Sequence, residues 1–303
     1  MDTISDASAH SENSGDDNCE TFVCNSSYED KLRLIGRYWP STNDSCRGII
    51  LFVHGFGEHC QRYTHVAHFF NKYGFASVAF DFRGHGLSDG ERGFAPKLDA
   101  FLDDLESIIE RIRTQYQPDV PLVIYAHGTG SLLCLAHIIR RPSKPLDCQA
   151  MVISTPSICL KRRPTKLLLF FARTFANLDP HFLLPVQGNY THVYTNDPAV
   201  VEAYRKDPLV HDRWTASTVT IFMEVGVLLE KTILEAPWPL LIQHGDADTV
   251  TPISGIRKWV RNRVRGDARF KEWSGHFHEL HNDLGKEEIL MDAINWIYMK
   301  LQI

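Results

Sequence analysis

The chain has 303 residues, of which 44% are hydrophobic, and a formal net charge of -5. That length and apolar content suit one large α/β domain with an insertion, or two domains. Residues 1–30 hold eight acidic and no basic side chains, which leaves the rest of the chain at -5 + 8 = +3. A nucleic-acid-binding protein would show a concentrated basic face, so we expect no nucleic-acid partner.

The N-terminal segment is acidic, rich in Ser and Asn and poor in large apolar residues. We predict a disordered tail over residues 1–27, without a secretory signal or a myristoylation site. The seven cysteines are odd in number and show no CxxC pair, which favours reduced thiols. No apolar run reaches the length of a membrane span. We therefore expect a cytoplasmic protein, and peripheral contact with membranes is an alternative that depends on the apolar segment described below.

The predicted elements begin with a hairpin over residues 21–24 and 31–39. Apolar runs then alternate with helical patterns, and the runs lie at residues 48–55, 76–81, 121–128, 150–155 and 238–245. Continuous apolar runs are typical of strands buried on both faces, as in a parallel sheet. Two amphipathic helices follow the spacing of Phe101, Leu105 and Ile109, and of Ile289, Ala293 and Ile297. The alternation predicts a doubly wound, mostly parallel α/β sheet.

One stretch, residues 158–234, interrupts this rhythm because it holds several prolines and no clear buried strand. We predict a helical cap there, inserted between a first core segment (28–157) and a second (235–303). Its most apolar part runs through Leu167, Leu168, Leu169, Phe170, Phe171 and Phe175, preceded by Lys161, Arg162, Arg163 and Lys166. Two interpretations stay open: these apolar side chains form the core of the cap, or residues 161–175 form a lid face that meets acyl chains or a membrane surface.

The polar residues that follow the predicted strands suggest the chemistry of a serine hydrolase. In open α/β sheets ligands bind beyond the carboxyl ends of the strands. Serine hydrolases of this architecture place nucleophile, acid and His in that chain order, and the chain offers Gly128, Asp248 and His278. Competing choices are Asp246 for the acid and His276 or His281 for the base. His276, His278 and His281 could be drawn as zinc ligands, but no acidic or Cys residue is spaced so as to complete the set. We therefore expect no metal.

Five segments together resemble the monoacylglycerol lipase and lysophospholipase group of α/β-hydrolases, which is serine aminopeptidase S33-like. The resemblance covers residues 30–300, and its motifs are HGFGEHCQRY (54–63), DFRGHGLSDGERG (81–93), YRKDPLVHD (204–212), HGDADTVTP (244–252) and GHFHELHND (275–283). It selects Asp248 as the acid and His278 as the base. It also implies an oxyanion hole built from the backbone N–H groups of Phe56 and Thr129, no cofactor, and a single-chain lipid ester or acyl compound as the ligand.

The chain departs from that family at the nucleophile. Where the family pattern reads G-H-S-x-G-G, residues 126–131 read Ala-His-Gly-Thr-Gly-Ser. Glycine has no side chain with which to attack, and the nearby hydroxyls of Thr129 and Ser131 are poor substitutes because neither reaches His278 and the oxyanion hole together. In the DFRGHG segment, we interpret Asp81 and Arg83 as structural residues that tie loops together.

Three hypotheses follow. The first is a lipid-ester hydrolase scaffold in which only the nucleophile is replaced, with very low activity as written. The second is a pseudoenzyme that binds a lipid or acyl ligand under its cap without turnover. The third is an enzyme in which His278 and Asp248 activate water directly.

Overall fold

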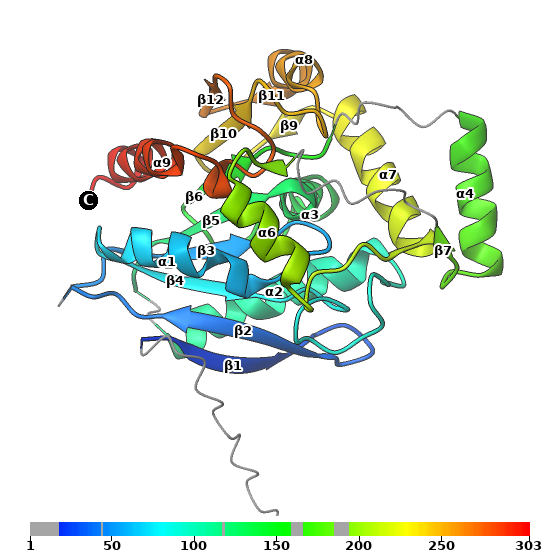
Figure 1. Ribbon diagram of the computed structural model, residues 1–303, viewed down its shortest axis with the longest axis horizontal. Helices are drawn as coiled ribbons and strands as arrows, with labels where there is room; N and C mark the ends of the chain where they lie inside the picture. Colours follow the sequence, from blue (N-terminus) through cyan, green and yellow to red (C-terminus); the bar gives the residue numbers. More distant parts are fainter. Residues whose placement is uncertain (1–17, 44, 117–118, 159–165, 185–193) are drawn as a thin grey trace, which may run out of the picture.

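The computed structural model describes residues 18–43, 45–116, 119–158, 166–184 and 194–303. Its centre is a sheet of eight strands, shown edge to edge in Figure 1. In sheet order the strands are β1 (Glu20–Asn25), β2 (Arg33–Trp39), β4 (Phe75–Phe80), β3 (Gly48–Val53), β5 (Leu122–His127), β6 (Ala150–Ser154), β10 (Leu240–Gly245) and β12 (Ala268–Trp273). Strand β2 is antiparallel to both of its neighbours, and the six strands β4, β3, β5, β6, β10 and β12 are parallel to one another.

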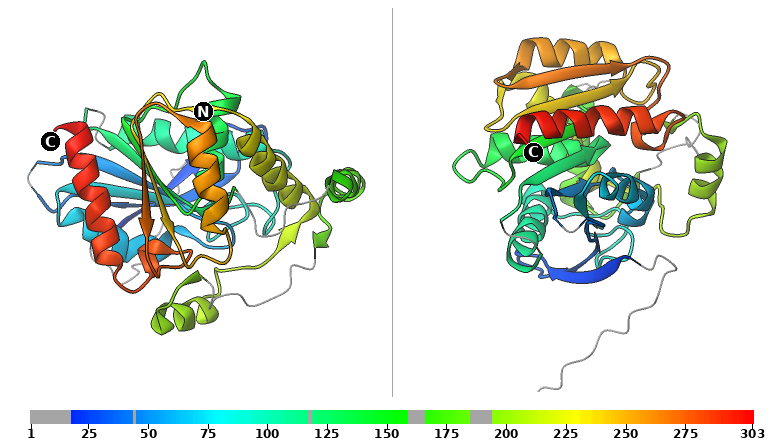
Figure 2. Two further views of the ribbon diagram at one scale, coloured as in Figure 1. Left: turned by 90° about the horizontal axis from the view of Figure 1, so that it is seen from above. Right: turned by 90° about the vertical axis from the view of Figure 1, so that its left-hand side faces the viewer.

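Helices cover both faces of the sheet. One face packs against α2 (Leu98–Gln115), α3 (Gly128–Arg140) and α8 (Ile253–Arg263), the other against α1 (Thr64–Asn71) and α9 (Lys286–Leu301). Figure 2 shows α8 and α9 on opposite sides of the strands. Successive side chains of a strand point to opposite faces, so Ile49 and Leu51 join one core cluster and Ile50 and Phe52 the other. The doubly wound, mostly parallel α/β-hydrolase fold is confirmed.

Each of the five buried strands predicted from apolar runs is present, and every residue of these strands is buried. Strand β12 was not predicted from an apolar run, because it is an edge strand whose residues are mostly exposed or half-buried. The predicted end of the disordered tail at residue 27 is wrong. Residues 20–25 form β1, because Phe22 and Cys24 alternate with exposed residues and pack into the core. Residues 1–17 lie outside the described part of the chain.

The segment between β6 and β10, for which we predicted a helical cap, contains helices and short strands. Its elements are α4 (Lys166–Leu178), β7 (Leu183–Leu184), α6 (Pro198–Lys206), β8 (Trp214–Thr215) and α7 (Ala216–Lys231), followed by β9 (Leu234–Glu235), which pairs with β11 (Val264–Arg265). The described residues also include two short 3₁₀ helices, η1 (Cys60–Tyr63) and η2 (Leu280–Asn282). Helix α4 packs against α7 and stands at the outer edge of the molecule (Figure 1).

The apolar side chains of α4 do not form a cap core. Leu167, Phe170, Phe171 and Phe175 are between 48% and 64% exposed. Residues 161–163, and the side chains of Lys166, Leu168 and Leu169, lie outside the described part. Of the two interpretations left open by the sequence, the first is therefore wrong for these four side chains. In the part of the chain that the structure describes, no helix combines the length and the apolar character needed to cross a bilayer.

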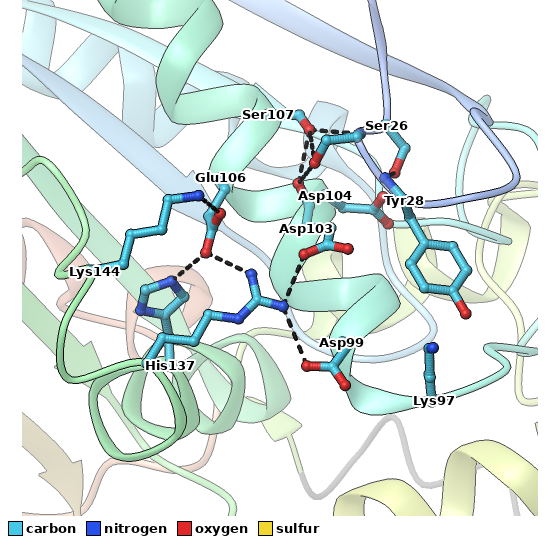
Figure 3. A network of polar contacts seen from close by, with 12 residues as sticks. Ser26, Tyr28, Lys97, Asp99, Asp103, Asp104, Glu106, Ser107, His137 and Lys144 are labelled. Carbon is cyan, nitrogen blue, oxygen red and sulfur yellow. Dashed lines mark hydrogen bonds and ion pairs between the residues drawn. The ribbon is translucent and has the colours of Figure 1, made fainter.

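A cluster of charged residues fixes the far end of α3. Glu106 on α2 accepts hydrogen bonds from Arg141 (2.5 Å) and from Lys144, and its Oε1 lies 2.8 Å from Nε2 of His137 (Figure 3). Burial opposes the charged carboxylate, but Lys144, Arg141 and His137 outweigh it and lower the pKa of Glu106 to about 2. Because α3 begins at Gly128, this cluster holds in place the helix whose first residue faces the candidate site.

The DFRGHG segment is structural, as the sequence predicted. Both carboxylate oxygens of Asp81 accept backbone N–H groups, at 2.7 Å from Cys60 and 2.7 Å from Leu87. Arg83 is buried and pairs with Asp104 on α2 (2.7 Å) and with Asp30 in the β1–β2 hairpin (2.7 Å). The loop is thereby tied to three separate parts of the core.

Candidate active site

The apolar strand and the cluster of small residues after it form a sharp strand-to-helix turn. Strand β5 ends at His127 and α3 begins at Gly128, whose φ is +54°. Only glycine adopts such a backbone without strain. Gly130 is required for another reason, because a Cβ there would lie 2.4 Å from the carbonyl oxygens of Val53 and His54. This is the geometry in which the α/β-hydrolases present their nucleophile.

The acid and base selected from the sequence lie together. Asp248 follows β10, and its Oδ1 accepts the backbone N–H groups of Val250 (2.7 Å) and Thr251 (3.0 Å). Its Oδ2 lies 2.7 Å from Nδ1 of His278, which is in the loop after β12. Both residues are buried. The carboxylate thus orients the imidazole and leaves Nε2 facing the cavity.

The competing residues are engaged elsewhere. Asp246 binds the N–H of Gly275 (2.6 Å) and the hydroxyl of Ser274 (3.1 Å). His276 Nδ1 lies 3.2 Å from Asp283. His281 is buried and stacks on Tyr63. Among the described residues, no group of three or more His, Cys, Asp or Glu is arranged to hold a metal ion.

The electrostatics of the pair favour a basic His278. Burial of the ring opposes its charged form, but the charge of Asp248 and its hydrogen bond outweigh burial and raise the pKa of His278. Burial also raises the pKa of Asp248 in isolation, and the charge and hydrogen bond of His278 reverse this and lower it. The neighbouring His127 behaves differently, because burial and the charge of His278 lower its pKa to about 3. Of these two imidazoles, only His278 is therefore suited to accept a proton near neutral pH.

The base points at position 128. A Cβ atom added to Gly128 would lie 3.6 Å from Nε2 of His278, and no atom outside the local chain would come closer. A serine Oγ, one bond farther along the side chain, would come within hydrogen-bonding reach of Nε2. Asp248 and His278 therefore have the arrangement of the acid and base of a triad, with no side chain at position 128.

A cavity of about 350 Å³ opens in front of this turn. It is lined by the predicted oxyanion residues Phe56 and Thr129, by the catalytic candidates Gly128 and His278, and by apolar side chains of the core and cap that include Leu132, Trp214, Val219, Phe222 and Met223. Thr129 lies in the first turn of α3, where the backbone N–H has no partner within the helix. The ring of Phe56 stacks on Trp214 of β8 with centroids 3.7 Å apart, which joins the loop after β3 to the segment between β6 and β10.

A buried charged group beside the cavity was missed by the sequence reasoning. Glu58 and Glu279 both line the cavity, and Arg62 joins them with contacts of 3.1 Å and 2.5 Å. Glu58 also accepts the N–H of Gly55 at 2.5 Å and thereby shapes the oxyanion loop. The signal was present, since Glu58 and Arg62 stand in the quoted HGFGEHCQRY segment, four residues apart.

Three hydroxyl groups lie near position 128, and the structure separates them. Ser131 is buried and donates to the carbonyl of Ala126 (2.8 Å), so its hydroxyl faces the strand. The hydroxyl of Thr129 is buried without a hydrogen-bond partner among the described residues. Ser157, which the sequence analysis did not select, lines the cavity, with its Oγ 3.7 Å from the Cβ position of residue 128.

Comparison with known proteins agrees with this fold. The family described as "Serine aminopeptidase, S33" matches residues 44–285. A monoacylglycerol lipase of Mycolicibacterium smegmatis is 30% identical over 271 residues, covering 89% of this chain and 94% of the lipase. Mouse monoglyceride lipase is 26% identical over 270 residues, and the match covers 87% of this chain and 86% of the lipase. The crystal structure of the monoacylglycerol lipase of Paleococcus ferrophilus is 26% identical and superposes with a TM-score of 0.73, covering 88% of this chain and 99% of that structure.

The site and the fold together define an α/β-hydrolase with the layout of a serine esterase. Within that class, the chain belongs to the serine aminopeptidase S33 family and is built on a scaffold like that of the monoacylglycerol lipases.

Proposed function

We propose that this chain is a hydrolase scaffold for single-chain lipid esters that turns over very slowly as written, because Gly128 supplies no nucleophile. The observation that carries the proposal is the position of His278. Its Nε2 lies 3.6 Å from the site of a Cβ on residue 128, and its Nδ1 is held by Asp248 at 2.7 Å. In this proposal Asp248 orients the base, His278 moves the proton, and the N–H groups of Phe56 and Thr129 receive the developing oxyanion.

The expected loss of activity is large. Removing the nucleophile of such a triad lowers kcat by about 10⁶-fold, which corresponds to roughly 8 kcal/mol of transition-state stabilisation. About 10³- to 10⁴-fold acceleration over water remains from the oxyanion hole and from binding. An ordinary ester assay would therefore detect little turnover by the chain as written.

The lining of the cavity supports an ester with an apolar acyl chain and a polar head. Leu132, Phe222 and Met223 supply apolar surface, whereas Glu58 and Glu279 place carboxylates beside the same cavity. An amphipathic ligand matches both kinds of surface. The relatives named as monoacylglycerol lipases support the same class of substrate.

Restoring the serine tests the proposal. Hydrolysis of p-nitrophenyl butyrate and of a monoacylglycerol is measured for the chain as written, for Gly128→Ser, and for Gly128→Ser combined with His278→Ala. We expect strong turnover from Gly128→Ser alone and its loss when His278 is also replaced. If Gly128→Ser folds but does not turn over either ester, the hydrolase proposal is wrong.

The second candidate is a pseudoenzyme that holds a lipid or acyl ligand without turnover. The observation that favours it is that Gly128 occupies its positive-φ position without strain while the cavity in front of it stays open. Calorimetric titration with a non-hydrolysable ether analogue of a monoacylglycerol tests it. Binding to both the chain as written and Gly128→Ser, with no turnover by either, would favour this candidate over the first.

We also propose that α4 contacts a lipid surface. Leu167, Phe170, Phe171 and Phe175 are exposed on one helix at the outer edge of the molecule (Figure 1), and contiguous exposed apolar patches on soluble domains mark interaction sites. Co-sedimentation with phosphatidylcholine–phosphatidylglycerol vesicles should fall when Phe170 and Phe171 are both replaced by Glu. The matched control is Met299→Glu, which changes a side chain that is 60% exposed on the distant α9. Equal binding by both variants would contradict the proposal.

A further inference from the structure

The space beside Gly128 is bounded by two polar atoms. A Cβ on residue 128 would lie 3.6 Å from Nε2 of His278, 3.7 Å from Oγ of Ser157 and 3.8 Å from Cα of Gly55. These are ordinary van der Waals distances, so the space admits one small group without displacing its neighbours. One of the polar atoms is a proton acceptor and the other is a hydroxyl that both donates and accepts.

The position of Ser157 is fixed relative to this space. Strand β6 pairs with β5, and the chain after β6 turns at Thr155, whose φ is +43°. The hydroxyl of Thr155 lies 3.0 Å from Nδ1 of His127, and its N–H donates to Gln243 at 2.8 Å. The N–H of Ser157 then donates to the carbonyl oxygen of Gly128 at 3.3 Å. Ser157 is therefore anchored to the residue that lacks the nucleophile.

We propose that Ser157 Oγ and His278 Nε2 together hold a water molecule beside Gly128, and that this water is the attacking nucleophile of the chain as written. The two polar atoms lie 3.6 Å and 3.7 Å from the Cβ position, so a water oxygen beyond that position, in van der Waals contact with Cα of Gly128, would lie beside both, and hydrogen bonds to them would be about 2.8 Å long. Gly128, Ser157 and His278 all line the cavity of about 350 Å³, which is large enough to hold a water molecule. The inference rests on the proposed function, because it needs an ester bound in the same cavity.

The step balances without a covalent intermediate. Nε2 of His278 takes a proton from the water, whose oxygen forms a bond to the ester carbonyl carbon. The carbonyl π electrons move to oxygen, which accepts the N–H groups of Phe56 and Thr129. The tetrahedral intermediate then collapses, the bond from carbon to the alcohol oxygen breaks, and the leaving oxygen takes the proton from His278. The products are the carboxylic acid and the alcohol, and Ser157 holds the water throughout without reacting.

The test removes the hydroxyl of Ser157 in the chain as written and, separately, in the Gly128→Ser variant. The slow hydrolysis of p-nitrophenyl butyrate is measured for the chain as written and for Ser157→Ala, His278→Ala and Ser274→Ala. The last is the matched control, since Ser274 is an exposed serine outside the cavity. We expect His278→Ala to abolish the residual rate and Ser157→Ala to lower it about fivefold, as for the loss of one hydrogen bond to the water.

In the Gly128→Ser background the attacking oxygen is covalently held, so Ser157→Ala should lower kcat by a smaller factor. This difference between backgrounds is a readout that a purely structural role for Ser157 would not give. It also separates the two proposals, because an active Gly128→Ser variant supports the hydrolase scaffold whatever Ser157 does.

Diisopropyl fluorophosphate followed by intact-protein mass spectrometry gives the second readout. We expect labelling of Gly128→Ser and no labelling of the chain as written. Labelling of Ser157 in the chain as written would overturn the water mechanism, because Ser157 would then be the nucleophile. A residual rate that does not exceed that of His278→Ala, or one that Ser157→Ala leaves unchanged, would also overturn it.

Discussion

The backbone at Gly128 predicts a measurable stability cost for any side chain placed there. Gly128 has a φ of +54°, in the left-handed region, which costs an L-residue about 1–2 kcal/mol. An alanine also reduces the freedom of the unfolded chain, which returns about 0.4–1 kcal/mol. The nearest atom to the new Cβ is 3.6 Å away, so no steric overlap adds to the balance. We expect Gly128→Ala to lower the free energy of unfolding by about 1 kcal/mol.

Two other glycines calibrate this value. Gly275 has a φ of +78°, and a Cβ added there would meet no atom within 4 Å, so Gly275→Ala measures the backbone strain alone. A Cβ on Gly130 would lie 2.4 Å from two carbonyl oxygens, so Gly130→Ala adds overlap with rigid backbone and should cost several kcal/mol. We expect Gly130→Ala to lose much more free energy of unfolding than Gly128→Ala. Gly128→Ala and Gly275→Ala should lose similar amounts.

Equilibrium unfolding in urea, followed by the fluorescence of the six tryptophans, measures all three variants. If Gly128→Ala loses about 2 kcal/mol more than Gly275→Ala, the space beside residue 128 does not accept a side chain. The reasoning that links His278 to a serine at that position would then fail. If Gly128→Ala is as stable as the parent chain, the backbone there is not left-handed. The same strain applies to Gly128→Ser, so we expect restored activity to come with lower stability.

Three further predictions concern charged groups. Asp248→Asn should lower the pKa of His278, because burial is then no longer opposed by the charge of Asp248, and NMR titration of the ring protons measures this. Since the folded-state pKa of Glu106 is lowered to about 2, its contribution to stability is present above about pH 4.3 and is lost as the pH falls toward 2, so Glu106→Gln should flatten the pH dependence of urea unfolding over that interval. Arg83→Met should lower the free energy of unfolding by about 3–5 kcal/mol, because it leaves Asp104 buried without its counter-charge; a loss below 1 kcal/mol in the same assay would contradict this.

The buried strands with a strong apolar pattern and the opening hairpin could be located from the sequence, whereas the edge strand β12 could not. The buried strand over residues 122–127 is apolar on both faces and was predicted to within one residue. Strand β12 (268–273) was not recognised as a buried run because an edge strand has one neighbour and keeps polar side chains such as Arg269 and Glu272. The exposure of Phe170 and Phe171 could likewise not be predicted from periodicity, because an apolar helix face has the same sequence pattern whether protein or lipid covers it.

Chain order offered Asp248 and His278 among competing residues and the family resemblance selected them, but neither pointed to Ser157. Asp248 and His278 follow strands in the order that the architecture requires, and the structure places them 2.7 Å apart. Ser157 also follows a predicted strand, so the same rule could have selected it. Its importance depends on a pairing that the sequence does not state, namely that β6 lies beside β5 and brings Ser157 to within 3.7 Å of the Cβ position of residue 128.

The presence of Asp248 and His278 is not by itself an argument for turnover, because both residues also hold the loops around them. Asp248 caps its turn through Val250 and Thr251, and the carbonyl of His278 accepts the N–H of Leu280 at 3.1 Å. These contacts would persist in a protein that only binds its ligand. Nε2 of His278 takes no part in them, and it faces the space beside Gly128 from a ring that is otherwise buried. A structural role explains one side of the imidazole, but it does not account for the orientation of Nε2 toward position 128.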